Sequence, residues 1–497
     1  MTTNPDNEPT RLRDSRTVKM FFWPAVWLTL ALLLFATWRL YWKAQLRHEQ
    51  ELVRAAGYPA DLEELDAWYK KPVGRNAADY WVKAHSSWVK DQALEDWMPC
   101  MTTQPDSAAG MYNTEEKLGL QYPDDLMGKV RDYCAKNEPS FDLMREAAKV
   151  DGCRWNLDLK KGLAASVPYL GEQKRMCNLV SERMRLAAKD KDWSTFEEFM
   201  DVEYKLADDI GGGPTLISSL VADSIEAKGL NTLMCDLPFL DGNAVHLEAI
   251  QKTLMTQRAK ADQRMAFAYH GEEALMLADS VISASLDEPK VWVMFRGREN
   301  SKAEVILWKT LGGLDHDRRK IAMQEQKIAE VNLLPSDKRL AAIRTVETDW
   351  DASVHPWELL CHEMTMMETS NLTINHLLSL TSFDTAITAI AVERYRLDHA
   401  KLPATLSDLV PAYLPAVPGD AFNHGKPLHY KVESDRFSVY SIGKNEIDDG
   451  GRVEYSWSWS GSGSAPPHAD DITFTLLLPN APRGIVPKRK DLPGVGK

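Results

Sequence analysis

Between about residues 50 and 400, the spacing of apolar residues is mostly that of helices, and strand-like alternation is scarce. Two apolar stripes, at 179–187 and 196–206, are separated by the polar residues 190–192, and this pattern predicts an αα-hairpin. The run 211–214, Gly-Gly-Gly-Pro, is expected to end the second helix. Glycine accepts positive φ and proline suits the first helical position, so we expect Pro214 to begin a third helix.

The apolar pattern changes near the C-terminus. After Ala400 prolines become frequent, and short β-type runs occur at 428–432 and 437–442. The predicted fold is therefore mainly α, with a small C-terminal α/β unit. Further helices are predicted at 128–149, 243–257, 262–286, 301–330, 335–348 and 357–399.

An apolar stretch near the N-terminus predicts a membrane anchor. Residues 20–38 carry no charge, tryptophan and tyrosine gather near both ends of 20–42, and the length suits a bilayer core. A cleaved signal peptide is the alternative, but its apolar region spans only about 7 to 15 residues and ends in a small-residue cleavage site, which is missing here. We expect a single-pass anchor through membrane lipid at 20–42.

Basic residues flank the anchor on both sides, with a slight excess before it. Because basic flanks stay in the cytoplasm, residues 1–19 are expected inside and the bulk of the chain outside. This orientation gives a single-pass membrane protein with an extracytoplasmic body. The basic residues are Arg11, Arg13, Arg16 and Lys19 before the uncharged stretch 20–38 and Arg39, Lys43 and Arg47 after it.

Composition excludes several classes of protein. The 497 residues carry a formal net charge of −13, so nucleic acid is not an expected partner, because binding to phosphates needs a concentrated basic surface. The six cysteines form no Cys-x-x-Cys pair. Their irregular spacing favours buried free thiols over disulfides, which stay the alternative in an extracytoplasmic domain.

The polar clusters in the helical region do not form a recognised catalytic motif. His270 with Glu272 and Glu273, and the triplet 315–317, are interpreted as solvated faces or turns. The helical region has many carboxylates, but the sequence offers no reason to choose an acid and base pair among them. No catalytic residue is assigned, and an enzyme is the less favoured interpretation.

The C-terminal region contains, in order, the segments 391–399, 401–409, 411–418, 425–430 and 437–443. Over residues 384–478 this series resembles the C-terminal domain of the major pseudopilin of type II secretion systems. The whole chain is also similar to membrane-anchored proteins of planctomycete-type bacteria that carry the same tail and an upstream Leu-Asp-Ala-Trp-Tyr, here at 65–69.

The pseudopilin resemblance implies an antiparallel sheet packed on a helix and a calcium site in the loop after 437–443. Its ligands would be the carbonyl of Ile442, the side chain of Asn445, and Asp470 and Asp471, because oxygen donors suit a hard cation. This chain departs from the family by Asn445 in place of aspartate and by the insert 457–467. The prepilin processing pattern is also missing before the anchor, so assembly into a pilus is not expected.

Two functions are compatible with these features. The favoured one is a membrane-anchored scaffold or binding protein that contacts other envelope proteins, and the alternative is an envelope hydrolase with a carboxylate-based site in the helical region. The expected division is a cytoplasmic tail at 1–19, an anchor at 20–42, a helical region at 43–356, a pseudopilin-like domain at 357–480 and a disordered basic tail at 481–497.

Overall fold

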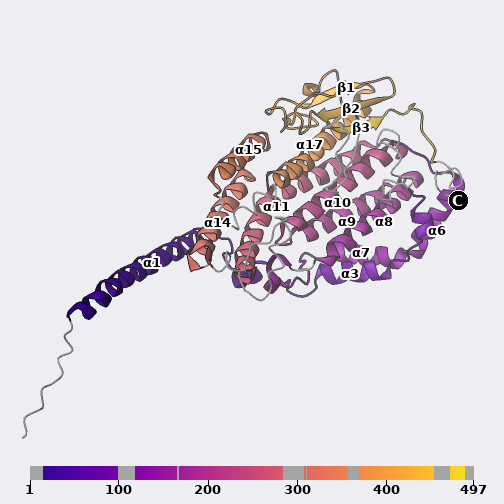
Figure 1. Ribbon diagram of the computed structural model, residues 1–497. Helices are drawn as coiled ribbons and strands as arrows, with labels where there is room; N and C mark the ends of the chain where they lie inside the picture. The colour runs from indigo at the N-terminus through magenta and orange to yellow at the C-terminus, as the bar shows by residue number, and fades with distance from the viewer. Residues whose placement is uncertain are drawn as a thin grey trace, which may run out of the picture.

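A computed structural model gives the fold as a helical body with one small sheet. Helices make up 68% of it, which confirms the mainly α prediction. Helix α1 projects from the body, and the three strands lie together on another side of it (Figure 1). The structure describes residues 15–98, 118–164, 167–283, 307–308, 310–355, 358, 369–452 and 471–486.

Helix α1 (Ser15–Ala55) has two parts with different surroundings. We call residues 20–42 its apolar half and residues 43–55 its second half. The stretch Phe22–Ala55 is long and apolar enough to cross a membrane, and none of its most apolar window is buried in the body. In the second half of the helix, Leu46 and Val53 are buried where α1 packs on α14 (Gly313–Val331). The helix is unbroken between the halves, so the apolar half and the body are joined without a linker.

The predicted αα-hairpin is present as α8 (Pro168–Asp190) and α9 (Trp193–Gly211). Lys191 takes φ 58° and so reverses the chain after α8. Asp192 then caps α9, since its carboxylate accepts a hydrogen bond of 3.0 Å from the Thr195 amide. The polar turn between the stripes therefore both ends one helix and begins the next.

The third helix, α10 (Leu216–Asp236), packs on both members of the hairpin. It begins two residues later than predicted, because Thr215 rather than Pro214 provides its start. The Thr215 hydroxyl accepts a hydrogen bond of 3.2 Å from the Ser218 amide, which satisfies one of the free amides of the first turn.

The glycines before α10 are needed for close packing rather than for positive φ, which corrects the reason given from sequence. Gly212 has φ −72°. A Cβ on Gly211 would lie 2.3 Å from Cδ of Arg264, and one on Gly213 would lie 2.8 Å from Oγ of Ser218. The absence of a side chain at Gly211 thus leaves room for the buried Arg264.

Two helical predictions differ from the structure in where the helices break. The predicted segments 243–257 and 262–286 fall in one helix, α11 (Ala244–Ser283), and residues 284–286 lie outside the described residues. No glycine or proline separates them, and Arg258 in the expected gap is tied to Asp384 at 2.9 Å. The sequence between the two stripes therefore continues the helix instead of ending it.

The predicted helix at 128–149 is instead divided into α6 (Asp124–Lys136) and α7 (Glu138–Ala148). Asn137 stands between them, and its side chain exchanges hydrogen bonds of 2.8 and 3.1 Å with the backbone of Val89. Pro139 is the second residue of α7, in the first turn, where its missing N–H costs little.

The remaining helices complete the body around α11. The predicted helix 301–330 has its regular part in α14, and 369–399 of the predicted 357–399 form one helix. Residues 359–368 lie outside the described residues. The helices of the body not yet named are α2 (Leu62–Trp68), α3 (Ala77–Ser87), α4 (Gln92–Glu95), α15 (Ser336–Ser353) and α17 (Thr369–His399).

The predicted strands are confirmed in a small antiparallel sheet of order β1-β2-β3. Strand β1 (His429–Val432) pairs with β2 (Arg436–Ser441), and β2 pairs with β3 (Ile472–Leu477). Val439 and Phe474 face each other across β2 and β3. The sheet packs on α17 (Figure 1).

One apolar core runs through the helical body and the sheet. It contains Phe199 of α9, Phe383 of α17 and Phe437 of β2, all without solvent exposure. The amide of Thr475 in β3 also lies 3.3 Å from Sδ of Met234 in α10. The domain boundary at residue 357 stays a prediction, but the apolar packing crosses it.

Part of the predicted disordered tail is packed on the body. The amide of Gln121 donates to the carbonyl of Gly484 at 2.8 Å, and the amide of Val486 donates to the carbonyl of Gln121 at 2.9 Å. Val486 is buried. The prediction of disorder is therefore wrong for 481–486, and residues 487–497 lie outside the described residues.

A fragment of residues 357–480 is expected to be largely unfolded, because removing α10 and α11 exposes the faces of α17 and β3 that they cover. Far-ultraviolet circular dichroism and thermal unfolding of the fragment, compared with the full chain in detergent, measure this. A cooperative unfolding transition in the isolated fragment would instead establish an independent domain.

Candidate functional site

The C-terminal loop that the sequence singled out brings two predicted ligands close together. Asn445 donates a hydrogen bond of 3.1 Å to the carboxylate of Asp449, and the Asp449 amide lies 3.4 Å from Oδ1 of Asp471. Asp471 also accepts a hydrogen bond of 2.7 Å from the Gly451 amide. Asn445, Asp449 and Asp471 thus converge on one loop.

The structure describes only one of the other two predicted ligands, Ile442. The backbone amide of Ile442 donates to Asp420 at 3.0 Å, and this buried carboxylate also accepts from the Ser441 hydroxyl at 2.6 Å. Asp470 lies outside the described residues. Asp420 thus fixes the end of β2, just before the loop.

The carboxyl group of Asp471 in this loop is harder to ionise than an ordinary aspartate. Burial, together with the nearby carboxylates of Asp449 and Asp448, raises the pKa of Asp471 to about 6, although hydrogen bonds from two backbone amides oppose the shift. Within the described residues, no three histidine, cysteine or acidic side chains are grouped as a metal site. A cation in this loop would therefore need Asn445 or backbone carbonyls as further ligands, which are donors that calcium accepts.

A second cluster, which sequence reasoning missed, lies in the helical body between α10, α11 and α17. Nδ1 of His376 lies 3.0 Å from the carboxylate of Asp223, and both side chains are 1% exposed. Arg264 donates to Glu226 at 2.5 Å and lies 4.0 Å from Asp223. We call Asp223, Glu226, Arg264 and His376 the buried polar network.

Gln257 links the buried polar network to a groove on the surface. The side-chain nitrogen Nε2 of Gln257 lies 2.8 Å from the carboxylate of Glu226 and 2.7 Å from that of Asp208. Asp208 lines an open groove of about 340 Å³ between α9 and α11, together with Lys205 and Lys260. The buried Gln257 also lines the groove, and its side chain lies between Asp208 and Glu226.

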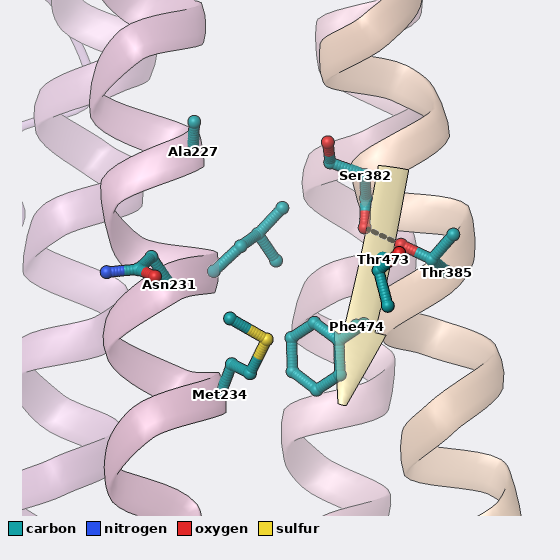
Figure 2. Close-up of a pocket in the computed structure, with 8 residues that line it drawn as sticks. Ala227, Asn231, Met234, Ser382, Thr385, Thr473 and Phe474 are labelled. Carbon is teal, nitrogen blue, oxygen red and sulfur yellow. Dashed lines mark hydrogen bonds between the residues drawn. The ribbon is translucent and has the colours of Figure 1, made fainter. Parts of the chain in front are cut away.

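A smaller cavity farther along α10 and α17 holds only about 20 Å³. Figure 2 shows Asn231 and Met234 from α10 on one side of it and Thr473 and Phe474 of β3 on the other. Its volume suits a single water molecule, and the buried hydroxyl of Thr473 has no protein partner. The cavity is therefore too small for a substrate.

Four of the residues that were expected on solvated faces are instead buried, near the part of α1 that packs on the body. His270, Glu272 and Glu273 of α11 are buried, and so is Asp317 of α14, so that interpretation is wrong for them. The His270 ring stacks on Tyr58, with ring centroids 3.5 Å apart. Both flanks of this part of α11 are covered by other helices, which the local charge pattern does not reveal.

Several buried glutamates have raised pKa values because burial disfavours the charged carboxylate. The pKa is about 8 for Glu203 and about 7 for Glu226 and Glu272. Burial and the nearby Glu273 also raise the pKa of Glu325. Groups with such pKa values are suited to proton transfer near neutral pH, but none of these four glutamates lines the groove or the small cavity described above.

Cysteine chemistry does not contribute to these clusters. Cys134, Cys177 and Cys235 are buried and Cys153 is partly exposed, and none of these four forms a disulfide. Burial raises the pKa of Cys134 to about 12, so its thiol stays protonated at neutral pH. The other two cysteines, Cys100 and Cys361, lie outside the described residues.

The stability of the protein is expected to fall as pH rises from about 5 to 8. The folded state keeps a proton on Glu203 up to its pKa of about 8, while the unfolded state loses it near 4.5, so each pH unit between these values costs up to about 1.4 kcal/mol. Glu203→Met should flatten this dependence and raise the melting temperature at pH 8.

Thermal unfolding of the full chain at pH 5 and pH 8 measures this effect. Glu198→Met is the matched control, because Glu198 lies on the same helix with an exposed side chain. An equal pH dependence in the Glu203→Met protein and the unmutated protein would contradict the assignment.

Comparisons with known proteins did not connect the chain with a characterised group. No family model matches it, and no curated protein and no solved structure matches it. The pseudopilin resemblance and the functions below therefore depend on the residues of this chain alone.

Proposed function

We propose that this protein is a single-pass scaffold or binding protein of a bacterial inner membrane, with its body held outside the cytoplasm. The observation that carries this proposal is the unbroken helix α1, which passes from an exposed apolar half to a half that is packed on the body. Residues 20–42 contact membrane lipid, and residues 1–19 form the cytoplasmic tail.

Contacts along α1 support a rigid connection between anchor and body. Trp38 Nε1 donates to the carbonyl of Leu311 at 2.9 Å, and Arg319 of α14 pairs with the buried Glu49 at 3.0 Å. Such contacts restrict rotation of the body about the anchor. A scaffold gains from this, because its binding surfaces keep a fixed height and orientation above the bilayer.

The C-terminal unit is proposed to be pseudopilin-like and stabilised by calcium. The three-stranded sheet on α17 and the convergence of Asn445, Asp449 and Asp471 support this proposal. Deprotonating Asp471 beside other carboxylates is costly, and a bound cation would offset that cost. Other envelope proteins are the proposed partners, and the acidic composition disfavours nucleic acid.

An envelope hydrolase is the second candidate, and the pairing of His376 with Asp223 favours it. A histidine oriented by a carboxylate is a common general base. His376 is fully buried, however, and the side chain of Gln257 lies between Glu226 of the network and Asp208 of the groove. A substrate would need a different arrangement of α9 and α11 to reach it, so the scaffold is the preferred proposal.

The orientation is tested with protease added to intact spheroplasts. Cleavage of the body after Lys43 is expected, because the basic N-terminal tail remains inside. Replacing Arg11, Arg13 and Arg16 with glutamine should reduce the cleaved fraction, while detergent-permeabilised cells provide the control for full cleavage. Protection of everything after Lys43 in intact spheroplasts would contradict the orientation, and recovery in the soluble fraction would contradict the anchor.

The calcium proposal predicts a higher melting temperature in calcium than in chelator at pH 7.5. Saturation at about a hundredfold above the dissociation constant stabilises a folded protein by roughly 2.7 kcal/mol, which is a shift of a few degrees for a large chain. Asp471→Asn should remove the shift, whereas Glu433→Gln, in the β1–β2 turn, should keep it.

Lowering the pH tests the same site without a mutation. The pKa of Asp471 is about 6, so at pH 5 its carboxyl is mostly protonated and the calcium effect should fall sharply. Identical melting curves in calcium and in chelator at pH 7.5 would contradict a calcium site.

A further inference from the structure

Two exposed leucines lie on one helical turn just before α14. The amide of Leu311 donates to the carbonyl of Leu307 at 2.9 Å, so the two side chains, four residues apart, lie on the same face. Leu307 is 58% exposed and Leu311 is 50% exposed. We call this pair the leucine face. Trp308 between them is buried, so the turn itself is held against the body.

The leucine face lies beside the end of the apolar half of α1. Leu311 accepts the hydrogen bond from Trp38. One turn farther along each helix, the rings of Trp42 and His316 meet with centroids 4.4 Å apart. The two helices therefore run in the same direction from this point (Figure 1), and the leucine face is at the end of α14 that is nearer the apolar half.

The position along α1 corresponds to the boundary of a bilayer. Trp38 and Tyr41 are exposed aromatic side chains at the end of the apolar half, where tryptophan and tyrosine mark the lipid–water interface. Arg39 pairs with Asp315 at 3.4 Å, so charge is neutralised at this level. An apolar surface beside Trp38 is thus at the depth where lipid headgroups meet acyl chains.

We propose that the leucine face inserts into the interfacial region of the same bilayer that α1 crosses. This inference depends on the proposed membrane anchor and deepens it, because lipid then contacts the body as well as the anchor. Side chains at an interface gain free energy by burying apolar area among acyl chains. With α1 fixed on one side and the leucine face on another, the body would rest on the membrane in one orientation.

The chain offers a matched control at the other end of α14. Leu333 and Leu334 are also exposed leucines, but they follow the end of this 19-residue helix. A helix of that length spans about 29 Å. The control leucines are therefore well outside the interface if the helix leads away from the membrane, although their chemistry is the same.

Photocrosslinking to lipid tests the proposal. The full chain, with p-benzoylphenylalanine in place of Leu30, Leu307, Leu311 or Leu333 in separate variants, is reconstituted into phosphatidylethanolamine and phosphatidylglycerol vesicles and irradiated. Mass spectrometry then measures the lipid adducts, and circular dichroism checks the fold of each variant. We expect adducts at Leu30, and several-fold more adducts at Leu307 and Leu311 than at Leu333.

The outcomes separate this inference from the proposed anchor. Adducts at Leu30, with Leu307 and Leu311 no more reactive than Leu333, would overturn the leucine face and leave the anchor. Protein–protein adducts in place of lipid adducts at Leu311 would also overturn it, in favour of a second copy of the chain. An absence of lipid adducts at all four positions would overturn the anchor and the leucine face together.

Discussion

The packing of the second half of α1 against α14 is the contact on which the arrangement of this molecule depends. Leu46 and Val53 are buried there, and Glu49 is held by Arg319. Because the same helix exposes an apolar surface nearer its N-terminus, whatever holds that surface also positions the body. A flexible linker at residues 43–55 would separate these two roles, but a continuous helix combines them.

Inside the body, burying charge imposes a second constraint on packing. Arg264 approaches the backbone at Gly211 and pairs with Glu226, while His376 pairs with Asp223. Removing one partner from such a network leaves an uncompensated buried charge, which is costlier than removing all of it. The network therefore favours one relative placement of α9, α10, α11 and α17, whether or not it also has a chemical role.

Sequence patterns were sufficient for features that depend on local periodicity. The stripes of α8 and α9, the strands β1 and β2 and the apolar half of α1 repeat with the spacing of their elements, so they could be predicted. Helix ends were less certain: Thr215 begins α10 in place of Pro214, and α11 continues where a break was expected. Such ends depend on side-chain hydrogen bonds and ion pairs with distant residues.

The candidate sites were harder to predict, because burial depends on tertiary contacts. His270 and Glu273 form part of a charged run that is typical of a solvated face, yet other helices cover them. His376 and Asp223 are 153 residues apart, so their pairing leaves no local signal. In the C-terminal loop, the spacing of Asn445 and Asp449 could have suggested that Asp449 joins the predicted ligands, whereas its contact with Asp471 requires the sheet.

Hydrogen exchange of the full chain in lipid nanodiscs tests the central claim, that residues 46–55 of α1, beyond the proposed membrane anchor, are docked on the body. Amides at 46–55 lie past the apolar half, so the bilayer does not protect them. If they are docked on α14, they should exchange as slowly as the amides at 321–331 within that helix. Rapid exchange at 46–55, with slow exchange at 321–331, would show that the anchor and the body move independently.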